Sequence, residues 1–252
     1  MSGVVGESLE QALARLARAD RLLLALDFDG TLSPLVDHAD SARMVPTAAA
    51  ALRRLSAAPG VSVALVSGRP IDRLRRVAAM PPRVLLAGSH GAELAGPGGA
   101  FAAPAAGERA RVEALLAELH AELGAVPGVR VEAKPYGAGV HWRLTPGPLR
   151  PGVRATAVAV ARRHPGLTAR NGKDLVEFSV RSATKGDALR ALRRAVRADA
   201  VLFAGDDVTD EDGFAALGPA DVGIKVGPGR SRARFRVDGI GSLARLLSRF
   251  GR

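Results

Sequence analysis

Residues 22–35 read LLLALDFDGTLSPL, and this stretch indicates the architecture of the whole chain. Its apolar run is typical of a buried strand and ends at Asp27, with a second carboxylate, Asp29, two residues later. Ionised side chains are costly to remove from water without partners. The two acids therefore mark either a solvated strand end or a functional site.

Similar apolar runs recur along the chain, and helical patterns separate them. Apolar strands that alternate with helices are typical of a parallel sheet covered on both faces, the α/β class. The predicted strands are residues 22–27, 61–66, 83–87, 200–205 and 221–226. The predicted helices are residues 9–16, 47–57, a helix from Pro70, and residues 184–197, 211–216 and 239–250.

The pattern changes in the middle of the chain. A helix is predicted at 108–123, two short strands near 129–133 and 138–145, a helix near 150–163 and a strand around 174–180. This order predicts an α+β insert with an antiparallel sheet. The predicted fold is a doubly wound, Rossmann-like parallel-sheet core, residues 1–104 and 182–252, with a smaller α+β cap domain at 105–181.

Composition excludes several classes of protein. The chain has 252 residues, of which 47% are hydrophobic and 24% charged, as in ordinary globular proteins. It has no cysteine, which excludes disulfides and thiolate zinc sites and fits a reducing compartment. Residues 1–20 do not resemble a secretory signal, and no apolar run approaches the roughly 20 residues of a membrane span. We expect a cytoplasmic protein without a membrane partner.

The net charge of +11 raises the possibility of a nucleic-acid partner. Only four of the 36 basic residues are lysines, however, and the arginines are scattered over the predicted helices. A genome rich in arginine codons explains this distribution most simply, and a basic funnel for an anionic substrate is the alternative. We expect no nucleic acid as partner.

Four polar clusters follow predicted strands or open a predicted helix. In open α/β sheets, ligands bind at the carboxyl ends of the parallel strands. The clusters are DFDGT at 27–31, SGR at 67–69, Lys185 at a helix start, and GDDVTDED at 205–212. We therefore expect them to form one site.

The residue types indicate phosphoryl transfer. Asp27, held at a strand end, can attack phosphorus as a nucleophile, and Asp29 can protonate the leaving oxygen and then deprotonate water. Asp206 and Asp207 offer the oxygen ligands that Mg²⁺ prefers. Lys185 would offset the negative charge. Gly30 and Thr31 would leave backbone amides free for a phosphate, and Ser67 could donate to a phosphate oxygen. The chemistry predicted is phosphate transfer through an aspartyl-phosphate.

The four clusters, in this order, resemble the motifs of the haloacid dehalogenase-like phosphatases. In that superfamily an Asp two residues after the nucleophile is typical of phosphohydrolases and phosphomutases, whereas ATPase pumps have threonine there. Five further segments resemble the trehalose-6-phosphate phosphatase family: GSHGAEL (88–94), EAKPYGAGVHWR (132–143), RNGKDLVEFSV (170–180), TKGDAL (184–189) and GDDVTDEDGF (205–214).

The resemblance implies roles for individual residues in a Mg²⁺-dependent hydrolase acting on trehalose 6-phosphate. The catalytic residues would be Asp27, Asp29 and Lys185. The metal would be held by the Asp27 carboxylate, the Asp29 carbonyl and Asp206, with support from Asp207 and Asp210. The phosphate would contact Gly30, Thr31, Ser67, Gly68 and Arg69. The sugar would contact His90, Glu93, Glu132, Lys134, His141, Arg143, Lys173 and Glu177.

Several alternatives remain open from the sequence. Glu132 and Lys134 could form a solvated strand face, Lys173 could lie in a hairpin turn, and His141 could bond only within the cap. The chain could hydrolyse another phosphate, such as sucrose phosphate, mannosyl-phosphoglycerate or a hexose phosphate. It could also be a catalytically silent binding or regulatory domain, although no obligate protein partner is evident.

Overall fold

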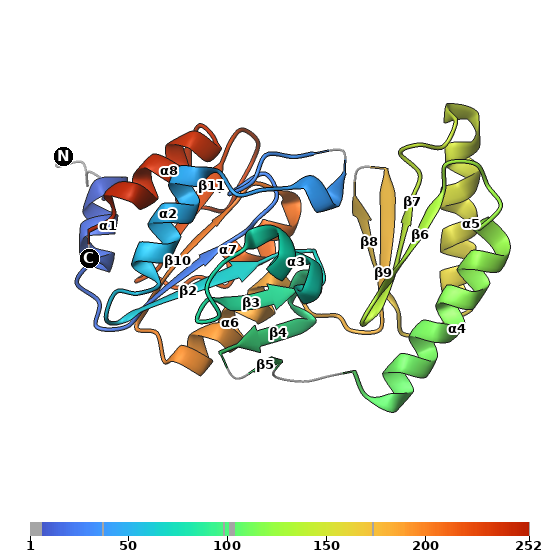
Figure 1. Ribbon diagram of the computed structural model, residues 1–252, viewed down its shortest axis with the longest axis horizontal. Coiled ribbons are helices and arrows are strands. Elements are labelled where there is room, and N and C mark those ends of the chain that lie inside the picture. The colour runs from blue at the N-terminus through green and yellow to red at the C-terminus, as the bar shows by residue number, and fades with distance from the viewer. Residues whose placement is uncertain (1–6, 37, 98, 101–103, 173, 252) are drawn as a thin grey trace, which may run out of the picture. The chain divides into compact units, whose positions relative to one another are not determined.

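The computed structural model describes residues 7–36, 38–97, 99–100, 104–172 and 174–251, and it divides into two compact units. The core unit comprises Met1–Phe101 and Ala183–Arg252, and the insert unit comprises Ala102–Ser182 (Figure 1). Among the described residues, no helix is both long enough and apolar enough to cross a bilayer.

The core unit is built on one sheet, in which β1 (Leu22–Leu26) lies between β10 (Ala200–Gly205) and β2 (Val61–Val66). The strand order is β12-β11-β10-β1-β2-β3-β4-β5. The strands β12 (Phe235–Val237), β11 (Val222–Val226), β10, β1, β2 and β3 (Leu85–Gly88) run parallel, and β4 (Glu93–Gly96) and β5 (Gly99–Ala100) are antiparallel additions. The end of β1 therefore lies near the middle of the sheet.

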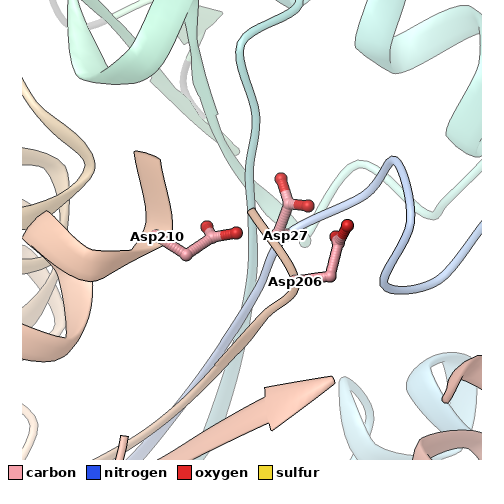
Figure 2. Close-up of side chains that lie close together, drawn as sticks. All are labelled: Asp27, Asp206 and Asp210. Carbon is pink, nitrogen blue, oxygen red and sulfur yellow. The ribbon is translucent and has the colours of Figure 1, made fainter. Parts of the chain in front are cut away.

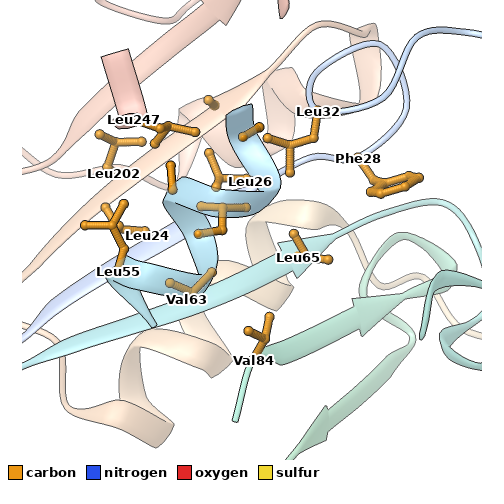
Figure 3. Close-up of a cluster of buried hydrophobic side chains, with 14 of the residues drawn as sticks. Leu24, Leu26, Phe28, Leu32, Leu55, Val63, Leu65, Val84, Leu202 and Leu247 are labelled. Carbon is orange, nitrogen blue, oxygen red and sulfur yellow. The ribbon is translucent and has the colours of Figure 1, made fainter. Parts of the chain in front are cut away.

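Alternate residues of β1 pack on opposite faces of this sheet, because side chains alternate along a strand. Leu24 and Leu26 join the hydrophobic cluster that α2 contributes to (Figure 3), and Leu23 and Ala25 join the cluster on the other face. The first cluster draws on α1 (Leu9–Leu16), α2 (Pro46–Leu55), α3 (Ile71–Ala78) and α8 (Ile240–Arg249). The second draws on α6 (Lys185–Val196) and α7 (Glu211–Ala215). Each buried leucine contributes about 1.5–3 kcal/mol, so the strand that carries Asp27 is held firmly.

The insert unit is an antiparallel sheet with helices on one face. Its strand order is β6 (Arg130–Lys134), β7 (Gly137–His141), β9 (Leu175–Ser179) and β8 (Thr168–Gly172). The helices α4 (Ala106–Leu123) and α5 (Arg150–Arg162) pack on this sheet through Leu119, Val140 and Phe178. The residues between these apolar positions lie on the opposite face, which carries polar side chains.

The α/β class and the parallel sheet predicted from the sequence are confirmed. Four short strands escaped prediction: β4, β5, β8 and β12. β8 reads TARNG and has no buried residue, so it carries no hydrophobic alternation. β5 and β12 have two and three residues, too few to show a period.

Candidate active site

Asp27 lies directly after β1 and continues its hydrogen-bonded ladder. Its backbone N–H donates to the carbonyl of Ala204 on β10 at 2.9 Å, and its side chain is 5% exposed. Figure 2 shows its carboxylate together with those of Asp206 and Asp210. The predicted nucleophile therefore lies where pairing with β10 fixes the backbone.

Lys185 neutralises part of this buried charge. Thr184 caps α6, its hydroxyl accepting from the N–H of Asp187 at 3.1 Å, so Lys185 is the first helical residue. The Lys185 ammonium donates to Asp27 Oδ1 and to Asp210 Oδ1, both at 2.7 Å. Burial lowers the pKa of Lys185, but the charges of Asp27 and Asp210 outweigh burial, so its pKa lies above the ordinary value. Lys185 therefore remains charged at neutral pH.

The acidic cluster fits a divalent cation. One carboxylate oxygen from each of Asp27, Asp206 and Asp210 lies within 4.8 Å of the others. Burial raises the pKa of Asp27 and of Asp206, and the charge of Asp210 adds to this effect in both. A small cation with oxygen ligands, such as Mg²⁺, would offset this repulsion. The residues present therefore suit the metal that the sequence predicts.

The three acids of the GDDVTDED segment that were predicted to hold or support the metal differ in their surroundings. Asp206 is partly buried within the cluster, whereas Asp207 is exposed and lies outside it. Asp210 is fully buried at the end of the short helix η4 (Val208–Asp210), with Oδ1 bonded to Lys185 and Oδ2 accepting from the Asp207 N–H at 2.9 Å. Asp210 is thus placed to orient Lys185, and Asp206 is better placed than Asp207 as a metal ligand.

Gly30 makes room for Asp206. Its φ is +82°, and a Cβ there would lie 2.1 Å from Asp206 Oδ2, so only glycine fits. Thr31 Oγ1 donates to Asp206 Oδ1 at 2.7 Å. The prediction that the Gly30 amide is free for a phosphate is wrong, because this N–H donates to the Ser33 carbonyl at 2.8 Å. This hydrogen bond closes the tight turn that follows Asp29.

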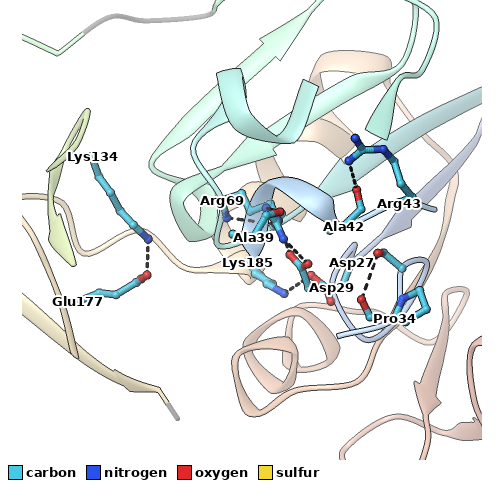
Figure 4. A network of polar contacts seen from close by, with 12 residues as sticks. Asp27, Asp29, Pro34, Ala39, Ala42, Arg43, Arg69, Lys134, Glu177 and Lys185 are labelled. Atoms are coloured by element: carbon cyan, nitrogen blue, oxygen red, sulfur yellow. Dashed lines mark hydrogen bonds and ion pairs between the residues drawn. The ribbon is translucent and has the colours of Figure 1, made fainter. Parts of the chain in front are cut away.

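Asp29 and Arg69 meet at the same edge of the sheet (Figure 4). Arg69 Nε donates to Asp29 Oδ2 and Nη2 donates to Oδ1, both at 2.6 Å. Arg69 Nη1 also donates to the Ala39 carbonyl at 2.7 Å, and the guanidinium lies 5.7 Å from the centre of the Phe28 ring. The sequence motifs predicted both residues but did not predict that they pair.

The SGR loop is supported by the GSHGAEL segment. Ser67 Oγ accepts from the Arg69 N–H at 3.1 Å, which leaves its own O–H to donate. The Ser67 carbonyl accepts from His90 N–H at 3.0 Å, and the Arg69 carbonyl accepts from Ser89 N–H at 2.8 Å. Ser89 and His90 lie in the short helix η2 (Ser89–Gly91) with φ of 48° and 57°. The left-handed backbone directs both N–H groups at the loop.

His90 and Glu93 contact this loop and helix α3. A Cβ on Gly68 would lie 2.6 Å from the His90 ring, so the ring rests directly against the loop. The Glu93 carboxylate accepts from Ser89 Oγ at 2.5 Å and from the Ile71 N–H at 3.4 Å. These contacts position the SGR loop; contact of His90 and Glu93 with a sugar stays a prediction.

The polar face of the insert unit brings together several predicted residues. Strand register aligns Glu132, Gly139 and Glu177 in one row across the sheet. Lys134 pairs with Glu177, and His141 Nε2 lies 2.7 Å from Glu132 Oε2. The side chains of Glu132 and Lys134 are 8% and 9% exposed, so the solvated-face alternative is wrong. His141 bonds to Glu132 within the unit, which is the contact that the alternative interpretation of His141 predicted.

Other predicted sugar-binding residues lie elsewhere. Arg143 follows β7, is half-exposed, and its Nε lies 4.0 Å from Asp174 Oδ2. Lys173 lies outside the described residues. The sequence patterns also gave no role to Lys225 on β11. This residue is 5% exposed, and its ammonium donates to the Asp206 carbonyl. Its one signal was its residue type in a chain that otherwise uses arginine.

A family model and curated relatives match most of the chain. The family model described as trehalose-phosphatase matches residues 25–239. A trehalose-phosphate phosphatase of Mycobacterium marinum is 37% identical over 234 residues, which cover 86% of this chain. The chain spans 58% of the length of that relative.

Solved structures share the fold. A trehalose-6-phosphate phosphatase related protein superposes with a TM-score of 0.75 at 24% identity, over 89% of this chain and 95% of its own. The C-terminal domain of a Candida albicans trehalose-6-phosphate phosphatase gives 0.79 at 20% identity, over 96% of this chain and 95% of its own. At these identities the similarity concerns the fold alone.

Proposed function

Because the chain belongs to the trehalose-phosphatase family, we propose that it hydrolyses trehalose 6-phosphate to trehalose and inorganic phosphate. The observation that carries the proposal is the position of Asp27, fixed after β1 with Lys185 on one oxygen and Asp206 beside it. A cytoplasmic location, which fits the absence of cysteine, is part of the proposal.

The reaction proceeds in two steps, formation of an aspartyl-phosphate and its hydrolysis. A carboxylate oxygen of Asp27 attacks phosphorus, forming the Asp27 O–P bond, and the bond between phosphorus and the sugar oxygen breaks. Asp29 gives its proton to the departing sugar oxygen. Asp29 then takes a proton from water, whose oxygen attacks phosphorus, and the Asp27 O–P bond breaks to release phosphate.

The surrounding residues prepare this chemistry. Lys185 holds one Asp27 oxygen and so orients the other. Ser67 has an O–H to donate to a phosphate oxygen, and Arg69 supplies a guanidinium whose planar N–H groups suit a phosphate. Asp27, Asp206 and the Asp29 carbonyl would hold Mg²⁺, which when bound supplies positive charge against the phosphate oxygens.

The polar face of the insert unit suits a sugar. Charged groups form strong, directional hydrogen bonds to hydroxyls, and Glu132, Lys134 and Glu177 lie together on this face. Gly139 carries no side chain between Glu132 and Glu177 in this row, and the His141 ring lies against it, 3.2 Å from where a Cβ would be. A sugar that displaces these existing pairs without replacing their hydrogen bonds would bind weakly, which is a basis for selectivity.

Phosphate release from a panel of sugar phosphates tests the proposal. We expect trehalose 6-phosphate to be turned over with a kcat/KM well above that of glucose 6-phosphate or sucrose phosphate. Comparable values would favour a less selective sugar phosphatase. The variant Asp27→Asn should keep the fold and lose phosphate release. An unmodified chain that binds the sugar phosphate without hydrolysing it would instead identify a silent binding domain.

A further inference from the structure

Lys225 is a buried cation that the proposed chemistry does not use. It lies in β11, where all five residues are buried, and its register partner is Gly205, the last residue of β10. Ile224 and Val226 belong to the apolar cluster on the α2 side of the sheet, so Lys225 points to the opposite face. Burying an ammonium group within a strand costs free energy, because the charge loses its contact with water.

The partner of this ammonium is the peptide of a proposed metal ligand. Lys225 Nζ donates to the backbone carbonyl of Asp206. In the part of the chain that the structure describes, no carboxylate forms an ion pair with Lys225. An apolar side chain of similar length would avoid the desolvation cost, so packing alone does not account for a lysine here.

The contact completes the support of Asp206. The pairing of β10 with β11 ends at Gly205, so the next carbonyl, that of Asp206, lies beyond the ladder. Lys225 provides a donor for it, while Thr31 Oγ1 holds the carboxylate at 2.7 Å. The two bonds restrain the residue at its backbone and at its side chain.

We propose that Lys225 is a positioning residue for the divalent-cation site, holding the Asp206 peptide so that its carboxylate stays beside Asp27. This inference rests on the metal site of the proposed function. Groups that orient metal ligands typically change metal affinity by about 10- to 100-fold when removed. A residue that only fills space would leave metal affinity unchanged.

Binding of Mn²⁺, which favours the same carboxylate ligands as Mg²⁺, provides a test that needs no turnover. Free Mn²⁺ would be counted by electron paramagnetic resonance during titration of the full chain and of the variants Lys225→Met and Lys225→Leu. Neither replacement has a hydrogen-bond donor for the Asp206 carbonyl, and the two differ in shape. We expect the dissociation constant for Mn²⁺ to rise by about 10- to 100-fold in both.

Arg236→Met is the matched control, because Arg236 donates to the carbonyls of Gly227 and Gly229 in the loop that follows β11. It should keep the wild-type Mn²⁺ affinity even where its melting temperature falls as far as that of a Lys225 variant. Wild-type affinity in either folded Lys225 variant would overturn the inference. If the unmodified chain itself binds no Mn²⁺, the metal part of the proposed function fails instead.

Discussion

Arg69 occupies both carboxylate oxygens of Asp29 through two parallel N–H···O bonds of 2.6 Å. The Asp29 carboxylate is therefore held as the partner of a guanidinium, although it is the proposed proton donor. A substrate phosphate would compete for the same guanidinium, since planar N–H pairs suit phosphate as well as carboxylate. We infer that Arg69 moves towards the phosphate when substrate binds and so frees Asp29.

Arg69→Lys tests this exchange. Lysine keeps the charge but cannot form two parallel bonds. Loss of one charge-assisted hydrogen bond costs about 1.5–3 kcal/mol, so we expect kcat/KM to fall by about 10- to 100-fold. Arg43→Lys is the control, because among the described residues Arg43 donates only to the backbone carbonyls of Asp40 and Ala42. Figure 4 shows its contact with Ala42. Equal kinetics in the two variants would contradict the exchange.

Lys185→Met should unfold the chain more easily as well as abolish phosphate release. The substitution leaves Asp27 and Asp210 buried without their cation, and removing one partner of a buried ion pair costs about 3–5 kcal/mol. Urea denaturation would measure the loss. Adding Asp210→Asn to Lys185→Met should recover part of the stability without activity, since one of the two unpaired charges is then gone. A double variant no more stable than Lys185→Met would contradict the charge argument.

Gly30→Ala should disturb the metal site through a single methyl group. Its Cβ would lie 2.1 Å from Asp206 Oδ2, on a backbone with φ of +82°. We expect phosphate release to require more Mg²⁺, and stability to fall by more than the roughly 1–2 kcal/mol of left-handed strain alone.

Gly227→Ala isolates that strain. Gly227 has a φ of +74°, and nothing lies within 4 Å of an added Cβ. In Gly227→Ala the free energy of unfolding should fall only by about the cost of the left-handed strain. The variant should keep the metal dependence of the unmodified chain. If both variants shift the metal dependence equally, the contact between Gly30 and Asp206 is not the cause.

Metal dependence should vary with pH. Burial raises the pKa of Asp27 and of Asp206, so these carboxyl groups take up protons at a higher pH than exposed acids. A proton and a divalent cation compete for the same oxygens. The half-saturating Mg²⁺ concentration for phosphate release should therefore rise as pH falls and decrease as pH rises. A value independent of pH across the acid limb of the rate profile would contradict this linkage.

Glu177→Gln should separate sugar binding from chemistry. It removes the charge that pairs with Lys134 on the polar face, so we expect KM for trehalose 6-phosphate to rise by roughly 10-fold or more. Hydrolysis of a small aryl phosphate, which has no sugar, should be little changed. Arg154→Gln, on the exposed surface of α5, is the control. Equal losses with both substrates would place Glu177 in the chemistry or the folding instead.

Much of the core was predictable because its signals are local. Leu22–Leu26 and Val61–Val66 are apolar runs of strand length, and each ends at a polar motif. The rule that ligands bind at the carboxyl ends of parallel strands then grouped Asp27, Asp206 and Lys185, and the structure brings these three together. Edge strands such as β8 were not predictable, because an exposed strand carries no apolar period.

The sequence by itself determined the order of the longer strands and helices and the identity of the charged groups near Asp27, since these depend on residue type and spacing. Only the tertiary structure decided which groups lie together: Arg69 with Asp29, Lys225 with the Asp206 carbonyl, and Gly30 with the Asp206 carboxylate, which leaves no room for a side chain. Each pair joins residues from different strands or loops. Their distances depend on sheet register and turn geometry, which no local pattern in the sequence records.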